Sequence, residues 1–509
     1  MGHSWKQDRT DKRLATRYKE VENVDVRDYS REMSLVDIPV AKAYRMDAAH
    51  VYIDILNVDE LLSCTQVEGE TCHKRTLRFL NQHYRAVHRI LAETHAVRVD
   101  FHNQRLHAVV PKPYGADGEV ERVATAVAIA QLAIDVLAET GDDDQQIPNA
   151  KVRVGIDTGL ALAVNNGRRN GREPLFLGCP ANRAAHCAGA GRTEGIFLTN
   201  TARTAMGFPV VAEGRDKFTA LTAEQIAACV ATADLGVSKD AIVKAWREEQ
   251  KDHPIGAFEF TRPTPPLANL DFEKLNASDT KHFDGVSVYA DIDGFTKYVE
   301  RHLTDNTEDL VRALHVLRSE LDAVVEGDFG GRRVRFIGDC LHGTLLEGTA
   351  KTTDVEDTIS TATLCAGALR SGFERALEFL DEKGVDVDAL GLAIGFDLGP
   401  LSLTRLGMKG DKVRCSTGRA VGRSEDEQKR CGGSQSAMGE AAYKSASTAV
   451  KDLFGATRRI SGLRYDTAVE QLEATGDRVA KAVYAEAVQR YTPAVASSLS
   501  EPLRPHTTG

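Results

Sequence analysis

The chain has 509 residues, too many for one compact core, so two or more domains are expected. With 42% hydrophobic and 27% charged residues, its composition is typical of a globular protein and not of a disordered one. The net charge of −10 argues against general binding to nucleic acid or to an anionic membrane surface. No run approaches the ~18 apolar residues that a membrane span needs, so no span is expected.

Cysteine usage and the N-terminal stretch indicate the compartment. The 9 cysteines are scattered without a C-x-x-C pair, so neither a zinc site nor a disulfide framework is expected. The charged stretch MGHSWKQDRTDKR lacks the apolar region of a signal peptide. A reducing cytoplasm is therefore the expected location.

Composition divides the chain into five parts. Residues 1–46 form a charged N-terminal extension, and residues 493–509 form a loose polar tail. Between them lie two long segments, 47–260 and 282–492. They are joined by a linker over 261–281, in which prolines and small polar residues interrupt any helix or strand pattern.

The two long segments repeat each other, which indicates a duplicated domain. Four stretches of the first match four of the second in the same order, at nearly constant offsets of 235 to 240 residues. Val51–Ile55 matches Val288–Ile292, Val97–Val110 matches Arg332–Leu345, Gly155–Gly159 matches Gly395–Gly399, and Gly178 matches Gly418. The chain is therefore expected to hold two copies of one domain.

The second copy shows the order of its elements clearly. A strand over Val286–Ala290 precedes a helix with one apolar face, a hairpin of the strands VRFI and LHGTL, a helix over 357–382, and a strand over LGLAIGFDLG. This β-α-β-β-α-β order is that of a ferredoxin-like α+β fold, in which the first strand and the hairpin are neighbours. Asp291 at the strand end and Asp339 at the hairpin turn are therefore expected to converge.

Two motifs of the second copy resemble those of the class III nucleotidyl cyclases, the family of adenylate and guanylate cyclases. The first is DIDGFT over 291–296, and the second is RFIGD over 335–339. The resemblance covers both copies and implies two tandem domains packed head to tail, with the active site between them. Asp293 is not a ligand position in the family pattern, and it is interpreted as a solvated turn residue.

The resemblance also implies the metal and phosphate ligands. In the family two acids and the backbone carbonyl after the first acid hold two divalent ions. The corresponding residues here are Asp291, Asp339 and Ile292, and the expected ions are Mg²⁺ or Mn²⁺. The ions assist the in-line attack of a 3′-hydroxyl on its own α-phosphate, which expels pyrophosphate. The residues expected to bind phosphate oxygens at a helix N-terminus are Gly294, Phe295 and Thr296.

The first copy lacks one of the two acids. It keeps Asp54 at the position of Asp291, but Gln104 stands where Asp339 does. A neutral amide is a poor ligand for a hard dication, so this copy is not expected to hold the pair of ions.

The first copy fits the partner role of the family instead. The partner domain supplies an Asn that orients the ribose and an Arg four residues later that stabilises the transition state. In PLFLGCPANRAAHCA, Asn182 takes the first position and His186 the second, with Arg183 as a possible substitute one turn earlier. In the second copy the glycine and Asn positions of this motif are matched with Gly422 and Asp426, and a carboxylate there would repel a triphosphate. One competent site and one relic are therefore expected.

The base-reading positions of the first copy are Asp100 and Leu175, which is neither the adenylate nor the guanylate pattern. Asp100 would accept a hydrogen bond from uracil N3–H or from the cytosine amino group. UTP is favoured because cytosine N3 is itself an acceptor. A duplicated cyclase without a purine pattern resembles the Pycsar pyrimidine cyclases of bacterial anti-phage defence, whose cyclic UMP or cyclic CMP is read by a separate effector.

Several alternatives stay open at this point. The substrate could be CTP or ATP, or the copies could bind a nucleotide without catalysis, against which the intact Asp291 and Asp339 argue. The two copies could pair within one chain or across a homodimer. A flexible linker of ~20 residues reaches roughly 25 Å on average, which makes pairing within one chain feasible.

Overall fold

The structure of the chain is a computed structural model that describes residues 3–35, 37–141, 146–166, 174–212, 218–408, 410 and 412–491. The predicted tail over 493–509 lies outside the described residues. Among the helices of this described part, none combines the length and the apolar character needed to cross a bilayer.

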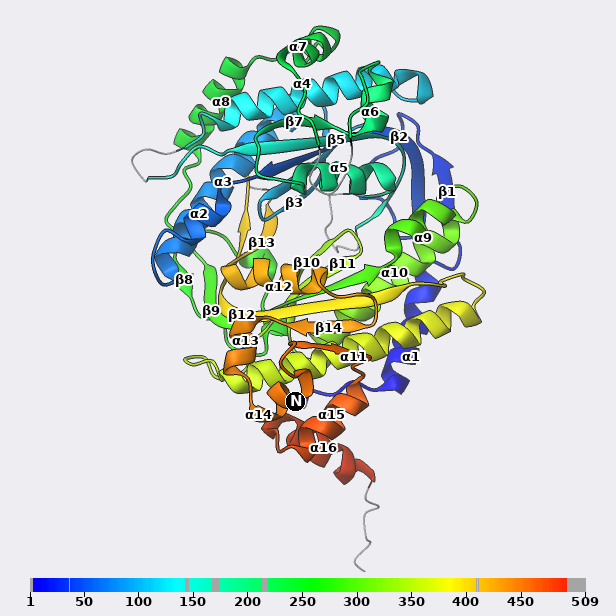
Figure 1. Ribbon diagram of the computed structural model, residues 1–509, viewed down its shortest axis with the longest axis vertical. Helices are drawn as coiled ribbons and strands as arrows, with labels where there is room; N and C mark the ends of the chain where they lie inside the picture. Colours follow the sequence, from blue (N-terminus) through cyan, green and yellow to red (C-terminus); the bar gives the residue numbers. More distant parts are fainter. Residues whose placement is uncertain are drawn as a thin grey trace, which may run out of the picture.

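The strands form two sheets, one in each half of the chain (Figure 1). The first sheet contains β1 (Asp25–Asp28), β2 (Lys42–Ile55), β3 (Val97–His102), β4 (Arg105–Val110), β5 (Val152–Asn165), β6 (Pro174–Leu177) and β7 (Gly195–Leu198). The second contains β8 (Phe260–Thr261), β9 (Thr280–Asp293), β10 (Arg332–Ile337), β11 (Cys340–Leu345), β12 (Gly391–Leu406), β13 (Val413–Thr417), β14 (Gln435–Met438) and β15 (Arg459–Ser461).

The helices follow the same division. In the first half they are α2 (Val58–Leu62), α3 (Glu70–Glu93), α4 (Glu119–Leu137), α5 (Cys179–Gly189), α6 (Asn200–Ala205), α7 (Ala223–Thr232) and α8 (Lys239–Asp252), preceded by α1 (Gln7–Glu20). In the second they are α9 (Phe295–His302), α10 (Thr307–Ala323), α11 (Val355–Glu382), α12 (Arg419–Lys429), α13 (Glu440–Ser445), α14 (Thr448–Phe454), α15 (Tyr465–Ala474) and α16 (Arg478–Tyr491). Figure 1 shows α5 and α12 between the two sheets, with α4 and α11 on the outer sides.

The two sheets share one strand order. The first runs β3-β4-β2-β5 and the second β10-β11-β9-β12, so the strand that carries the first acid lies between the hairpin and the long strand in both. The predicted β-α-β-β-α-β order of the second copy is confirmed by β9, α10, the β10–β11 hairpin, α11 and β12. Strand β2 begins at Lys42, a few residues before the predicted start of the first copy.

A glycine in each long strand lets a helix pack directly on the sheet. A Cβ on Gly155 would lie 2.2 Å from the carbonyl oxygen of Ala184 in α5, and a Cβ on Gly395 would lie 2.1 Å from the backbone nitrogen of Gln428 in α12. Any other residue would collide with helix backbone. The repeated glycine therefore seats α5 and α12 at equivalent places on the inner faces of the two sheets.

The starts of α5 and α12 fix the register of the repeat. Each helix begins directly after a glycine with a positive φ, 144° at Gly178 and 149° at Gly418. Asn182 therefore corresponds to Gly422, and the sequence-based match of Asn182 with Asp426 is wrong by one helical turn. The error arose because Asp426 follows Gly422 by four residues, which is the spacing of Gly and Asn in the Gly-x-x-x-Asn motif.

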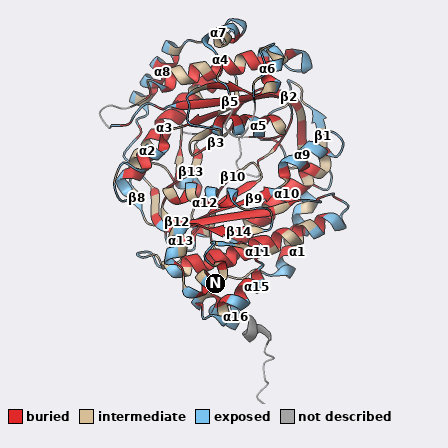
Figure 2. Ribbon diagram, in the orientation of Figure 1, coloured by how far each residue is buried: buried red, intermediate tan, exposed pale blue. Residues whose placement is uncertain are grey.

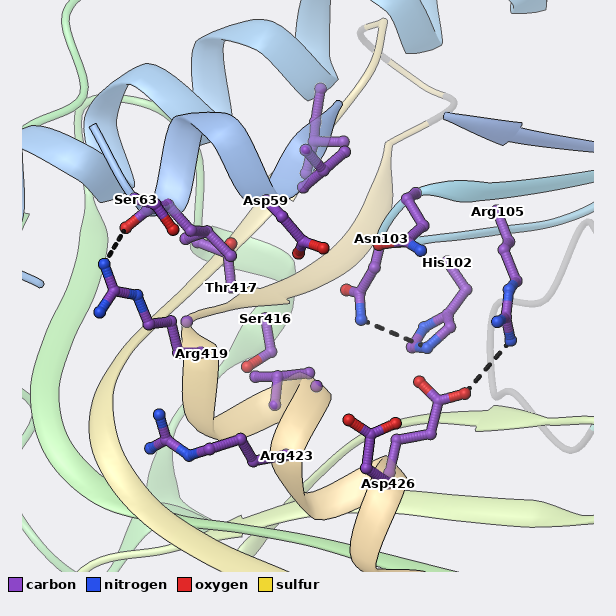
Figure 3. Close-up of a pocket in the computed structure, with 18 residues that line it drawn as sticks. Asp59, Ser63, His102, Asn103, Arg105, Ser416, Thr417, Arg419, Arg423 and Asp426 are labelled. Carbon is purple, nitrogen blue, oxygen red and sulfur yellow. Dashed lines mark hydrogen bonds and ion pairs between the residues drawn. The ribbon is translucent and has the colours of Figure 1, made fainter. Parts of the chain in front are cut away.

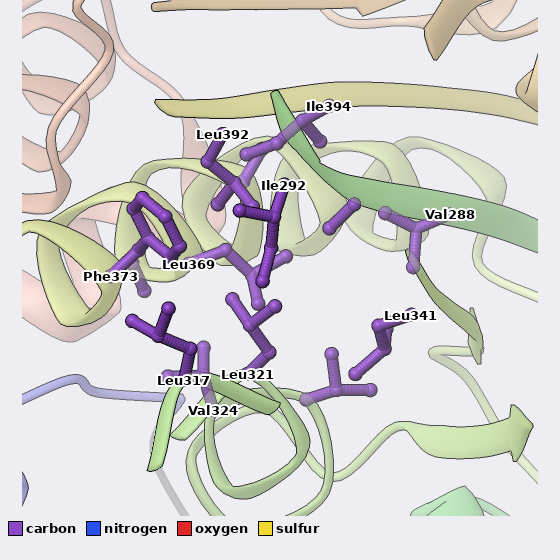
Figure 4. Close-up of a cluster of buried hydrophobic side chains, with 14 of the residues drawn as sticks. Val288, Ile292, Leu317, Leu321, Val324, Leu341, Leu369, Phe373, Leu392 and Ile394 are labelled. Carbon is purple, nitrogen blue, oxygen red and sulfur yellow. The ribbon is translucent and has the colours of Figure 1, made fainter. Parts of the chain in front are cut away.

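The strand that ends in Asp291 rests on a well-packed core. Figure 4 shows Ile292 of β9 close to Leu369 of α11 and Leu321 of α10, with Val288 on the side of Leu341, and all five residues belong to one hydrophobic cluster. Figure 2 shows the same burial along β5 in the first half and β12 in the second. Burying each such side chain contributes roughly 1.5–3 kcal/mol, so the acid is carried on a rigid support.

Each half packs side chains of one strand into the hydrophobic cluster of the other half, while that strand stays paired in its own sheet. Leu175 and Leu177 of β6 belong to the hydrophobic cluster of the second half, whereas Val413 and Cys415 of β13 belong to that of the first. Leu175 and Cys415 are also equivalent by the offset of 240 residues. Reciprocal insertion of equivalent strands is the contact pattern of a two-fold arrangement.

The N-terminal extension is ordered and connects both halves. Helix α1 packs on α10 and α11 of the second half. There Arg13 forms ion pairs with the buried carboxylates of Glu320, at 2.5 Å, and Asp328, at 2.9 Å. The chain then crosses to the first half, where β1 pairs in parallel with β2. Charges of the predicted charged extension are thus used in packing against the second half.

Candidate active site

The two predicted metal acids converge at one strand end. Strand β11 pairs with β9 in a register that opposes Leu341 to Ala290, which brings the hairpin turn beside the end of β9. Burial, with the nearby charge of Asp293, raises the pKa of Asp291 to about 6. Burial and the charge of Asp291 raise the pKa of Asp339 well above its usual range. A cation bound between two such adjacent carboxylates would favour their ionised forms.

Few polar groups hold these two carboxylates. Gln428 of α12 donates a hydrogen bond from Nε2 to Asp291 Oδ2 at 3.2 Å. Burial raises the pKa of both acids; the nearby thiol of Cys340 acts to lower the pKa of Asp291, and the backbone N–H groups of Asp339 and Ile292 act to lower that of Asp339. Within the described residues, no group of three His, Cys, Asp or Glu side chains gathers around a common point. A metal ligand set here would therefore consist of the two acids and backbone oxygen, as in the predicted pattern with Ile292.

The loop after Asp291 turns sharply into α9. Gly294 has a φ of 83°, and a Cβ there would lie 2.7 Å from the carbonyl oxygen of Ala389. Phe295 is buried and anchors the start of the helix in the core, whereas Thr296 is exposed. Asp293 is exposed and accepts a hydrogen bond from the backbone N–H of Gly433 at 2.8 Å, in agreement with the predicted turn role.

Helix α5 of the first half reaches this loop. Asn182 Nδ2 donates to Thr296 Oγ1 at 2.8 Å, and the thiol of Cys179 donates to Glu300 Oε1 at 2.7 Å. Asn182, Arg183 and His186 are all exposed on this helix. The predicted Asn of one copy and the predicted phosphate loop of the other are thus in contact within one chain.

The two residues considered for the transition-state role have different surroundings. The ring of His186 packs edge-on against Phe218, with ring centroids 5.6 Å apart. Arg183 lies close enough to Cys179 to lower its thiol pKa by its charge, although burial raises that pKa overall. Both side chains are exposed next to Asn182, so the role stays unassigned between them.

The two predicted base-reading residues lie in the interior between the halves. Asp100 Oδ1 forms an ion pair with Arg335 Nη2 of β10 at 3.0 Å. Leu175 is only 7% exposed and belongs to the hydrophobic cluster of the second half. Sequence reasoning missed both Arg335 and Gln428 as partners of site residues. Arg335 opens the quoted RFIGD motif and was the available signal, whereas Gln428 carried none.

At the equivalent strand end of the first half, a cationic side chain of the protein lies beside the carboxylate. Arg105 lies with Nε 4.0 Å from Asp54 Oδ1 and with Nη1 3.2 Å from Glu425 Oε1 of α12. Burial raises the pKa of Asp54, and the charge of Arg105 and a hydrogen bond from Gln104 oppose this rise. Arg105 occupies the place of Cys340 by the offset of 235 residues. A guanidinium thus stands beside Asp54 where the second half has a thiol.

Beside this strand end lies a pocket of about 420 Å³, bounded by α2 and by the start of α12 (Figure 3). Asn103 and Arg105 line it from the first half, and Arg419 and Asp426 from the second. With the register corrected, α12 has Gly422 at the position of Asn182 and Asp426 at the position of His186.

Comparisons with known proteins agree with these observations. A family model described as the adenylate and guanylate cyclase catalytic domain matches residues 42–223, which lie in the first half. A uridylate cyclase from Pseudomonas aeruginosa is 54% identical over 489 residues, covering 96% of this chain and 95% of that protein. A uridylate cyclase from a Rhizobium species is 38% identical over 442 residues, 83% of each protein.

A solved structure supports the same assignment. The crystal structure of a class III adenylyl cyclase-like ATP-binding protein from Pseudomonas aeruginosa has 55% sequence identity and a TM-score of 0.91, covering 93% of this chain and 100% of that chain. Identity of this level extends across both halves, and so includes the strand end that the family model does not reach. The chain therefore belongs to the class III nucleotidyl cyclases and is a nucleotide cyclase.

Proposed function

We propose that the chain converts UTP to 3′,5′-cyclic UMP and pyrophosphate at a single site between two head-to-tail cyclase domains. The observation that carries this proposal is the 2.8 Å contact between Asn182 and Thr296, beside the Asp291–Asp339 pair. It joins the ribose-orienting helix of one copy to the phosphate loop of the other. The domains would span 47–260 and 282–492, with the linker over 261–281.

Asp291, Asp339 and the backbone carbonyl of Ile292 would hold two divalent ions, Mn²⁺ or Mg²⁺. Class III cyclases generally use divalent metal ions, and two half-buried carboxylates side by side suit such an ion. The ions, when bound, lower the pKa of the 3′-hydroxyl and hold the leaving phosphates. Cys340 and Gln428 would keep Asp291 oriented, as outer hydrogen bonds do for metal ligands.

The remaining groups would bind and orient the triphosphate. Backbone N–H groups at the start of α9 would bind the phosphate oxygens, because the helix dipole favours negative charge there. Asn182 would fix the ribose so that its 3′-oxygen lies in line with the α-phosphate. His186 or Arg183 would stabilise the charge that develops on the phosphate oxygens.

For the base, the two curated relatives named uridylate cyclase favour UTP. Asp100 would accept a hydrogen bond from uracil N3–H, and Leu175 would give an apolar wall. ATP is the second candidate, because the similar Pseudomonas structure is described as ATP-binding. The product would be read by a separate cyclic-nucleotide effector in anti-phage defence, as the resemblance to the Pycsar cyclases implies.

A product assay tests the proposal. The purified chain is incubated with each of the four ribonucleoside triphosphates and Mn²⁺, and products are identified by mass spectrometry. Cyclic UMP as the main product is expected. No cyclic product from any substrate would overturn the enzymatic reading, and cyclic AMP alone would overturn the pyrimidine reading.

A further inference from the structure

An ion pair joins the two halves at the centre of the molecule. Arg335 Nη2 lies 3.0 Å from Asp100 Oδ1, with side-chain exposures of 1% and 16%. Arg335 also donates a hydrogen bond to the carbonyl oxygen of Phe101. Both residues lie on the hairpins, Asp100 on β3 and Arg335 on β10. The pair is thus a contact between the two copies and is nearly closed to solvent.

The partners occupy one and the same position of the repeat. Asp100 stands three residues before Asn103 and Arg335 three before Gly338, and these turn residues both have a positive φ. The offset of 235 residues between them is also that of the matching hairpins. Equivalent residues touch each other only where the pseudo-two-fold axis passes between them. The packing of β6 and β13 side chains into the opposite cores indicates the same axis.

A buried histidine and two tyrosines surround the pair. Burial together with the charge of Arg335 holds the pKa of His102 well below its usual range, so its ring is neutral. Tyr289 contacts His102 through its hydroxyl at 3.4 Å, and Tyr84 donates to the carbonyl oxygen of Asn103. Because Arg335 is almost fully shielded from water and Asp100 largely so, either charge left there without its partner would be desolvated at a high cost.

We propose that the ion pair of Asp100 and Arg335 makes the two copies complementary in charge at their pseudo-two-fold axis. Two identical copies would instead place like charges against each other there. In a symmetric pair this position would set two carboxylates or two guanidinium groups against each other. Opposite charges at the axis instead bind the first hairpin to the second and fix their register. This inference concerns assembly of the halves and does not depend on which base the site accepts.

Charge reversal in the full chain tests the proposal. Arg335→Asp makes both copies acidic at the axis, and Asp100→Arg makes both basic. Each is expected to raise the unfolding equilibrium constant by about 100-fold or more. The exchange of both residues, Asp100→Arg with Arg335→Asp, is expected to recover most of this loss. Stability is measured by denaturant unfolding, and compact pairing of the halves by small-angle scattering.

A milder set and a control keep the test decisive if a reversed variant does not fold. Asp100→Asn and Arg335→Gln, alone and together, should show coupling, with the double variant less destabilised than the sum of the single ones. The control is the exposed pair of Asp59 and Arg192, 3.2 Å apart, whose reversal should change stability little.

Independent losses that simply add, or single variants as stable as the original chain, would overturn the pairing role. Recovery of stability without recovery of substrate preference would support it and would also indicate that Asp100 contacts the base. The product assay described above is scored separately, so failure of the proposed substrate leaves this test intact.

Discussion

The ends of β9 and β2 occupy equivalent places in the two copies, but their carboxylates, half-buried at Asp291 and buried at Asp54, have different partners. Asp291 faces a second acid, Asp339, whose pKa its charge helps to raise. Asp54 faces Arg105 at 4.0 Å. A carboxylate removed from water needs a counter-charge. At equivalent places, therefore, the first copy sets a guanidinium of the protein beside its carboxylate, whereas the second copy sets another carboxylate there.

The largest expected difference is between the second acids. Asp339→Asn should lower cyclase activity by about 10³-fold or more, because metal stabilisation of transition-state charge contributes several kcal/mol. Asp54→Asn, the matched change at the other end, should leave activity within about twofold. Steady-state assays with UTP and Mn²⁺ measure both. Equal losses in the two variants would show that both ends bind metal, and would contradict the expected difference between the ends of β9 and β2.

The next effect concerns the helices that face the two ends. Asn182→Ala should reduce kcat by about 10²-fold with a smaller change in KM, because the side chain positions the ribose for attack. Asp426→Ala on α12 is the control and should have little effect. A loss of activity in the control alone would mean that the other end is the working one.

The same variants decide between pairing within one chain and pairing across a dimer. The contact between Asn182 and Thr296 is made inside one chain. A mixture of the Asp339→Asn and Asn182→Ala proteins should therefore remain inactive. In a swapped dimer the mixture would contain one intact site in each mixed pair, and recovered activity would contradict the intrachain site.

A smaller effect is expected at the outer hydrogen bonds. Gln428→Ala removes the donor to Asp291 and should weaken Mn²⁺ binding by about 10–100-fold. Gln104→Ala removes the donor to Asp54 at the other end and should leave binding unchanged. Calorimetric titration of Mn²⁺ in the presence of 3′-deoxy-UTP measures this directly. Unchanged binding in the Gln428 variant would remove it from the metal site.

The smallest effect is a pH dependence of metal stabilisation. Because the folded pKa of Asp291 is raised to about 6, the metal-free protein favours the protonated acid and loses this contribution to stability as pH rises through that value. Mn²⁺ needs both acids ionised, so its stabilising effect should grow as pH rises through about 6, and it should keep growing above that value because the pKa of Asp339 is also raised well above its usual range. Thermal unfolding with and without Mn²⁺ follows both trends. An Mn²⁺ effect that does not change with pH would contradict the coupled acid pair.

The sequence was sufficient for features set by local chemistry. The DIDGFT and RFIGD motifs predicted a strand, a sharp turn and a hairpin, and Gly294 and Gly338 have the positive φ that such turns need. The β-α-β-β-α-β order followed from periodicity, and the repeated glycine of Gly155 and Gly395 aligned the two copies correctly. These signals depend on backbone geometry, which neighbouring residues determine.

Features that depend on contacts between distant segments could not be predicted. Arg13 reads as a surface charge until Glu320 and Asp328 are brought against it. The pairing of Asp100 with Arg335 requires the axis between the copies, which no single motif contains. The match of Asp426 with Asn182 failed because spacing alone cannot show where a helix begins.

We expect one chain to hold one working site, built from the acids of the second copy and Asn182 of the first. The most direct test is the stoichiometry of 3′-deoxy-UTP binding with Mn²⁺, measured by calorimetry, because this analogue lacks the attacking hydroxyl and stays bound. One nucleotide per chain is expected, with binding lost in Asp339→Asn and kept in Asp54→Asn. Two nucleotides per chain, or binding lost only in Asp54→Asn, would contradict the claim.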